Sequence, residues 1–181
     1  MHRRPLLTLL DNYSARFPAE EATVNRLRNF VEANTHCFER SLLIGHITGS
    51  AWLLDSNGQR ALLTHHRKLG RWLQPGGHAD GDADVANVAL REAIEESGID
   101  DIAALSTKIF DIDIHEIPAR GAEPAHFHYD CRFLLQAAHN KYVVSEESND
   151  LRWISADEIT NLTDEESVLR MVRKWLDSAQ A

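Results

Sequence analysis

The stretch that decides the fold of this chain is Gly76–Ile99, which reads GGHADGDADVANVALREAIEESGI. A glycine-rich loop leads into a helix that is predicted to begin at Val85, because Asp82 and Asp84 are both suitable N-cap residues. Gly98 is the expected C-terminal stop, since glycine readily adopts the left-handed conformation that ends helices. The stretch therefore predicts a loop, a helix of about three turns and a sharp exit.

Three glutamates, Glu92, Glu95 and Glu96, share one face of this predicted helix, because positions i, i+3 and i+4 lie close together at ~100° per residue. The face expected to be buried consists of four apolar residues: Ala86, Leu90, Ala93 and Ile94. Neighbouring like charges weaken a helix, whereas clustered carboxylates supply the oxygen ligands that Mg²⁺ binds. Taken alone, the pattern fits both a solvated acidic face and a magnesium site.

The run Arg91–Ile99 resembles the second half of the Nudix box, R-E-U-x-E-E-x-G-U, where U is apolar. Gly77 lies at the correct distance upstream to be the opening glycine of that box. The resemblance implies a Nudix fold over about residues 40–160. It also implies a Nudix hydrolase with Mg²⁺, or alternatively Mn²⁺, as cofactor. Such an enzyme would use metal-activated water to cleave a phosphoanhydride bond of a nucleoside diphosphate linked to another moiety.

The resemblance also implies roles for individual residues. Glu95 and Glu96 are the expected metal ligands, and Gly77 is placed with them. Glu92 is expected to bind the metal or to position the attacking water. Arg91 is expected to hold Glu92 in place through a charge-assisted hydrogen bond.

One position departs from the box, which has a glutamate six residues after its opening glycine, where this chain has Ala83. Three aspartates crowd the same loop: Asp80, Asp82 and Asp84. His78 adjoins the Gly-Gly turn. We expect these neighbours to compensate for the missing carboxylate.

A further carboxylate is expected from the acidic loop that precedes Trp153, because Nudix enzymes often draw one from such a loop. Glu147 is favoured over Glu146 as an added metal ligand or catalytic base. The alternative is an acidic loop that contacts only water.

Histidines supply the next candidates. His126, His128 and Asp130 alternate within a predicted strand, so all three project from one face. Hydrogen bonding to substrate is the first interpretation, and the alternatives are a second metal site of transition-metal type and a purely structural role. His78, after the Gly-Gly turn, and Arg71, just before it, are further candidates for substrate binding. Other histidines are expected to be ordinary structural residues: His2, His36, His46 and His139.

Hydrophobic periodicity organises the rest of the chain into two parts, an N-terminal helical extension over residues 1–38 and a Nudix domain over residues 39–181. The extension is predicted to hold two short helices between residues 5 and 33. The domain is predicted to contain strands and a final helix: strands at 45–54, 61–64, 108–115 and 127–135, a strand end at 143–144, and a helix at 164–176. This order predicts an α/β (α+β) Nudix fold, a mixed β-sheet sandwiched between helices.

Composition limits the partners of this 181-residue chain, whose formal net charge is −9. A net negative charge of this size argues against nucleic-acid duplexes and anionic membranes as partners, because both are themselves negatively charged. No apolar run approaches the ~20 residues that span a bilayer. Cys37 and Cys131 form no disulfide framework, so we expect a cytoplasmic protein. A small-molecule nucleotide-type substrate is the expected partner, and a homodimer is left open.

Two other functions fit the same residues. A Nudix domain with weakened catalysis could act as a binding or regulatory module, which Ala83 favours. An enzyme resembling isopentenyl diphosphate isomerase, a Nudix relative that binds metal through histidines, is favoured by the many histidines. The intact Arg91–Gly98 run is more typical of the hydrolases.

Overall fold

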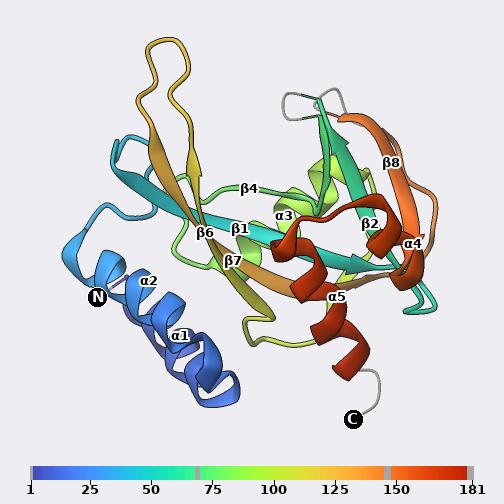
Figure 1. Ribbon diagram of the computed structural model, residues 1–181, viewed down its shortest axis with the longest axis horizontal. Coiled ribbons are helices and arrows are strands. Elements are labelled where there is room, and N and C mark those ends of the chain that lie inside the picture. The colour runs from blue at the N-terminus through green and yellow to red at the C-terminus, as the bar shows by residue number, and fades with distance from the viewer. Residues whose placement is uncertain (1, 68–69, 145–147, 179–181) are drawn as a thin grey trace.

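The computed structural model describes residues 2–67, 70–144 and 148–178. These residues form a mixed sheet of eight strands with helices on both faces (Figure 1). Its centre is β1 (Gly45–Leu54), which pairs in parallel with β7 (His126–Ala137). On its other side β1 pairs antiparallel with β2 (Arg60–His66) and β4 (Gly76–His78).

The remaining four strands extend the sheet on both sides. The strands β3 (Arg71–Leu73) and β8 (Ser148–Ser155) pair with β2, and β5 (Ile102–Ala104) and β6 (Asp111–Ile117) pair with β7. The hairpin of β6 and β7 forms one arm of the molecule, and the ends of β2 and β8 form another (Figure 1). The short strand β4 lies between these two arms.

Helices cover the two faces of the sheet. The helix α3 (Val85–Ser97) packs on one face, and α4 (Ala156–Leu162) and α5 (Glu166–Ser178) lie on the other (Figure 1). None of the described helices has the length and apolar character that crossing a membrane requires.

The alternation of side chains along β1 divides the apolar core in two. Ile47, Ala51 and Leu53 belong to the cluster that includes residues of α3, whereas Trp52 and Leu54 belong to the cluster with α5. Successive strand residues point to opposite faces, so one strand supplies both cores. Being apolar on both faces, this part of β1 must be an interior strand.

The N-terminal helices pack against the domain rather than standing apart from it. They are α1 (Arg4–Arg16), the 3₁₀ turn η1 (Pro18–Glu20) and α2 (Glu21–Ala33). Lys174 of α5 donates to the Tyr13 hydroxyl at 2.5 Å and forms an ion pair with Glu20 at 2.6 Å. The helices α1 and α5, whose apolar residues belong to different core clusters, are therefore joined through these polar contacts.

A network of buried charges lies between β6, β7 and α5. Asp111 is fully buried and accepts from Arg132 at 3.1 Å, from Arg170 at 2.8 Å and from Lys174 at 2.7 Å. Asp113 contacts Arg132 and Arg170 at 3.5 and 3.2 Å. These charges are mutually paired, which is the condition under which charged groups are tolerated in an interior.

Most of the longer elements expected from the sequence are confirmed, including both N-terminal helices, the hairpin of β1 and β2, the strands β6 and β7, and α5. The strand end expected at 143–144 is wrong, because residues 141–144 have no regular secondary structure. The strands β3, β4 and β5 and the helix α4 were not predicted, since three-residue strands and short helices carry too little periodicity. The eight-residue strand β8 was also missed, because its residues were interpreted as part of the acidic loop before Trp153.

The predicted buried face of α3 is wrong by about one position. The residues buried at its apolar face are Val85, Val88, Ala89 and Ala93, whereas Ala86, Leu90 and Ile94 are half-buried. Gly49 is the physical reason, because a side chain there would clash with the Val85 carbonyl and the Ala89 amide. The close approach of β1 at Gly49 turns this side of the helix inward.

Candidate metal and active site

The Gly76-Gly77 pair brings the backbone of β4 against the glutamates of α3. A Cβ atom added at Gly77 would clash with both carboxylate oxygens of Glu92, so a larger residue there would displace this carboxylate from its position beside the strand. The Gly76 amide donates to Glu96 Oε1 at 2.8 Å. The glycines thus let two predicted metal ligands approach the strand closely.

Arg91 joins the helix to the same strand. Its guanidinium donates to Glu92 Oε1 at 3.0 Å and to the His78 carbonyl at 2.9 Å. A charge-assisted contact of this kind restricts the rotamers of the carboxylate that accepts it. These two hydrogen bonds are the contacts that Arg91 would need in order to position Glu92, the role predicted for it.

The three glutamates differ in exposure. Glu95 is exposed, whereas Glu92 and Glu96 are half-buried. In the part of the chain that the structure describes, their oxygens do not all lie within 4.8 Å of one another. The donor set is nevertheless all oxygen and negatively charged, which fits a hard cation such as Mg²⁺.

Each of the three aspartates in the loop before α3 is already paired with another residue of the protein. Asp80 forms an ion pair with Arg40 at 2.5 Å. Asp82 accepts from the Asp84 amide at 2.9 Å and from the Asn87 side chain at 3.0 Å. Asp84 is the N-cap of α3 and accepts from the Asn87 amide at 3.2 Å. These contacts argue against the compensation expected for Ala83.

Ala83→Glu is therefore expected to strengthen metal binding. The change supplies an oxygen ligand beside a site whose neighbouring acids are already engaged. We expect the Mg²⁺ concentration that gives half-maximal activity to fall about tenfold, or ~1.4 kcal/mol. The control is Ala83→Gln, which has the same shape without the charge and should leave this concentration unchanged. Equal Mg²⁺ requirements in Ala83→Glu and wild type would show that other groups compensate after all.

A cluster of histidines lies on the opposite face of the sheet from α3. His46 is on β1, His78 on β4 and His128 on β7. Their ring centroids are 4.9 Å apart for His46 and His78, 4.9 Å for His46 and His128, and 5.0 Å for His78 and His128. One ring nitrogen from each lies within 4.8 Å of the other two. We call these three residues the histidine triad.

The pKa values of all three histidines of the triad are lowered, which favours the neutral imidazole. Burial is the main cause, and it lowers the pKa of His46 to about 4 and that of His128 to about 2. Neighbouring histidines lower both values further, because two imidazolium charges would repel each other. Burial, followed by Arg40, also lowers the pKa of His78.

His46 was not expected to be part of any site. On sequence alone it is one histidine at the start of a strand, with no second histidine nearby. The signal that could have found it is the parallel pairing of β1 with β7, which sets His46 directly beside His128. Local sequence does not encode that pairing.

Asp130 does share a face with His128, but it is committed to other partners. It is buried and accepts from Thr48 at 2.9 Å, from Ser50 at 2.8 Å and from Arg132 at 2.8 Å. A role in substrate binding would require it to leave these partners or to act through them. His126 is also buried, and its Nδ1 lies 2.9 Å from the Pro124 carbonyl oxygen.

Of the remaining predicted residues, Arg71 lies apart from this assembly and Glu147 is not described. Arg71 is on β3, where it forms an ion pair with Glu165 at 2.5 Å. Glu147, like Glu146, lies outside the residues that the structure describes.

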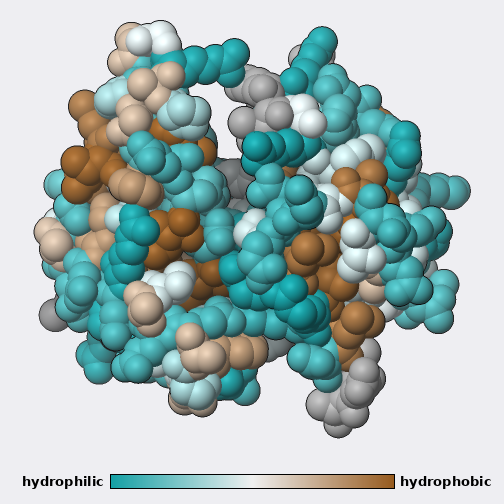
Figure 2. Space-filling model, in the orientation of Figure 1, coloured by the Kyte–Doolittle hydropathy of each residue, from teal (hydrophilic) through white to brown (hydrophobic). Residues whose placement is uncertain are grey.

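The surface around β4 is recessed. Figure 2 shows the molecule notched between the arm formed by β6 and β7 and the arm that carries β2 and β8. Hydrophilic residues form much of the rim of this notch. Figure 1 places β4 between the same two arms, so the Gly76–His78 strand and the elements beside it lie toward the recess.

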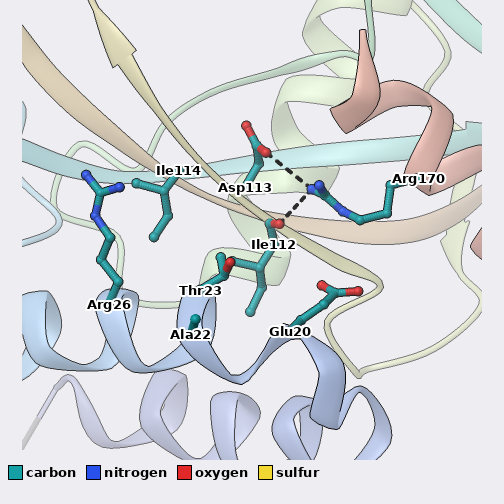
Figure 3. Close-up of a pocket in the computed structure, with 8 residues that line it drawn as sticks. All are labelled: Glu20, Ala22, Thr23, Arg26, Ile112, Asp113, Ile114 and Arg170. Atoms are coloured by element: carbon teal, nitrogen blue, oxygen red, sulfur yellow. Dashed lines mark hydrogen bonds and ion pairs between the residues drawn. The ribbon is translucent and has the colours of Figure 1, made fainter.

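A separate cavity of about 300 Å³ lies between α2 and β6 (Figure 3). Arg26, Ile114 and Arg170 are among its lining residues, and Arg170 donates to Asp113 and to the Ile112 carbonyl within it. Its lining contains none of the site residues predicted from the sequence. We therefore assign it no part in the candidate site.

Comparison with solved structures shows the same fold in other proteins. An Ap4A hydrolase of C. elegans has 16% identity and a TM-score of 0.53, covering 74% of this chain and 97% of its own. The E. coli dihydroneopterin triphosphate pyrophosphohydrolase has 18% identity and a TM-score of 0.57, with coverages of 71% and 92%. A MutT NUDIX hydrolase from Burkholderia pseudomallei has 21% identity and a TM-score of 0.55, with coverages of 72% and 97%. At such identities the likeness concerns the fold.

No curated protein matches the sequence of this chain. A family model does, and it is described as the NUDIX domain, with residues 46–176 matched. That range takes in β1, the glycine turn, all of α3 and most of α5. The chain therefore belongs to the NUDIX domain family.

Proposed function

We propose that this chain hydrolyses a phosphoanhydride bond of a nucleoside diphosphate linked to another moiety, with Mg²⁺ or Mn²⁺ as cofactor. Its class, a Nudix hydrolase acting on pyrophosphate bonds, follows from its family. The substrate and the metal are the proposal. The observation that carries it is the intact Arg91–Gly98 run, with Glu92 held between Arg91 and the Gly77 backbone.

The proposed metal ligands are Glu92, Glu95 and Glu96, with Gly77 beside them and Glu147 as an added ligand or base. When bound, the cation would activate a water molecule and neutralise charge on the phosphates. Arg91 fixes the orientation of Glu92, and the Gly76 amide fixes that of Glu96. Preorganised groups of this kind cost little reorganisation during the reaction.

Nucleotide-type substrates are supported by the structural neighbours. One is named for Ap4A, one for dihydroneopterin triphosphate, and the NUDIX domain of Shewanella oneidensis NrtR was solved in complex with ADP ribose. We propose a substrate of the same general chemistry for this chain. The substrate contacts predicted for five residues stay predictions: His78, His126, His128, Asp130 and Arg71.

A screen of nucleotide substrates with Mg²⁺ and Mn²⁺, in which products are identified by mass spectrometry, tests the proposal. We expect two phosphorylated fragments, one of which carries one oxygen from ¹⁸O-labelled water. A rearranged product of unchanged mass would favour the isomerase alternative. Binding of nucleotides without turnover would favour the regulatory module. Either result would overturn the proposal.

Mg²⁺ is expected to raise the thermal midpoint of the folded protein. A ligand that binds only the native state stabilises it by RT ln(1 + [L]/Kd), or about 1.4 kcal/mol at a tenfold excess over Kd. For a chain of this size that is a shift of roughly 3–6 °C. The shift should vanish in a Glu95→Gln, Glu96→Gln double variant. A matched variant, Glu21→Gln with Glu32→Gln, removes two exposed charges from α2 and should keep it. If the shift persists without Glu95 and Glu96, the dominant Mg²⁺ site lies elsewhere.

A further inference from the structure

The histidine triad is assembled by the register of three strands. His46 of β1 is the direct partner of His128 of β7, and His78 of β4 is the partner of Thr48, two residues further along β1. Residues two apart on a strand share a face, so all three imidazoles project from the same side of the sheet. Because β1 lies between β4 and β7, His46 is flanked by His78 and His128.

The triad is separated from the glutamates of α3 by the sheet itself. Gly77 and Gly49 face α3, since a side chain at either position would clash with that helix. Their neighbours in sequence, His78 and Thr48, point the other way. The two groups of potential ligands therefore lie back to back, with oxygen donors on one face and nitrogen donors on the other.

The triad contains buried polar atoms that the protein itself does not satisfy. His46 is only 2% exposed, and neither of its ring nitrogens has a hydrogen bond of good geometry, although the Leu42 backbone lies close enough to interact with the ring. The buried Nε2 of His128 also lacks one. Buried polar atoms without partners are rare because each loses its hydrogen bonds to water on folding. An electron-pair acceptor placed among these rings would satisfy one nitrogen of each.

We propose that His46, His78 and His128 bind a transition-metal ion, for which Zn²⁺ is the representative. Imidazole nitrogen is a ligand for Zn²⁺, Co²⁺ and Ni²⁺, whereas Mg²⁺ prefers oxygen. Tetrahedral bonds of 2.0–2.1 Å place ligand nitrogens about 3.4 Å apart. The nitrogens here lie within 4.8 Å of one another, so side-chain rotations that bring them closer by up to about 1.4 Å complete the set.

The surroundings suit a bound cation. The positive charge of Arg40, which lies close to His46 and His78, is offset by its ion pair with Asp80. Asp80 and Glu123 add negative charge near His78. Three protein ligands leave a fourth position for water, as in open zinc sites. The inference does not depend on the proposed hydrolysis, because it concerns the other face of β4.

Titration of the chelator-treated full chain with Co²⁺ tests the site directly. We expect one equivalent to bind with the intense visible absorption of a tetrahedral cobalt centre, and stoichiometric Zn²⁺ to abolish it. His128→Gln and His78→Gln should each weaken Co²⁺ binding at least about tenfold. His139→Gln, which changes an exposed histidine, should not. Circular dichroism of each variant verifies that it is folded.

Two further measurements separate this site from the magnesium site. The Glu95→Gln, Glu96→Gln double variant should bind Co²⁺ as wild type does, so a loss of binding there would overturn the inference. Zn²⁺ added to the wild-type chain should shift the imidazole NMR signals of His46, His78 and His128. Shifts confined to other histidines would overturn it, as would Co²⁺ binding that survives both His78→Gln and His128→Gln. The NMR measurement needs no variant and therefore does not depend on one folding.

Discussion

Glu95→Gln and Glu96→Gln are each expected to lower turnover at least a hundredfold, about 3 kcal/mol in the activation barrier. Each change removes a negative oxygen ligand from the proposed site while keeping the shape of the side chain. In Glu96→Gln the amide oxygen can still accept from the Gly76 amide, so the local structure should persist. The measurement is the initial rate at saturating Mg²⁺ on the best substrate from the screen.

The control for this loss is Glu32→Gln, an exposed glutamate on α2 whose replacement should leave turnover unchanged. In metal-free buffer both active-site variants should melt at the wild-type temperature or slightly above it, because a like-charge cluster is relieved. Near-normal turnover in either variant would end the assignment of that glutamate as a metal ligand.

Asp111→Asn is expected to produce the largest loss of stability. Asp111 is fully buried and contacts Arg132, Arg170 and Lys174. Removing its charge leaves these cations poorly compensated, and breaking buried pairs of this kind costs about 3–5 kcal/mol. Chemical denaturation of the two proteins at neutral pH measures the difference. Asp150→Asn disrupts an exposed pair with Arg152 and should change the free energy of unfolding by less than about 0.5 kcal/mol.

The same network gives stability a pH dependence. Burial opposes ionisation of Asp111, but its hydrogen bond to Arg170 and the nearby Arg132 and Lys174 outweigh burial and lower its pKa. A carboxyl whose pKa is lower in the folded state stabilises the protein above its unfolded value of about 3.9. That stability is lost as the pH falls further, toward the folded pKa. We expect acid to destabilise wild type more than Asp111→Asn, and equal acid sensitivity would contradict this role of Asp111.

The chemistry of α3 could be predicted from sequence because its signals are local. Asp84 caps the helix and Gly98 ends it in the left-handed conformation, as their positions in the sequence predict. The spacing of Glu92, Glu95 and Glu96 then follows from helical geometry. The burial of the opposite face depends on Gly49, which is far away in sequence, and it was therefore mispredicted.

The histidine triad could not be predicted for a related reason. His78 lies in a three-residue strand with no periodic pattern, and His46 meets His128 only through a parallel pairing of strands distant in sequence. The aspartates of the loop illustrate the same limit. Because the loop has three aspartates, the sequence predicted that one of them would be available to bind the metal. In the structure Asp80 forms an ion pair with Arg40, a residue remote in sequence.

The contact between Tyr13 and Lys174 constrains the order in which the chain can fold. These residues are 161 positions apart, so their hydrogen bond closes a loop that spans almost the whole polypeptide. A ribosome makes α1 before α5, so Tyr13 emerges 161 residues ahead of Lys174. Contacts of such separation form slowly. The polar contacts of Tyr13 and Glu20 with Lys174 therefore cannot form until α5 has been synthesised.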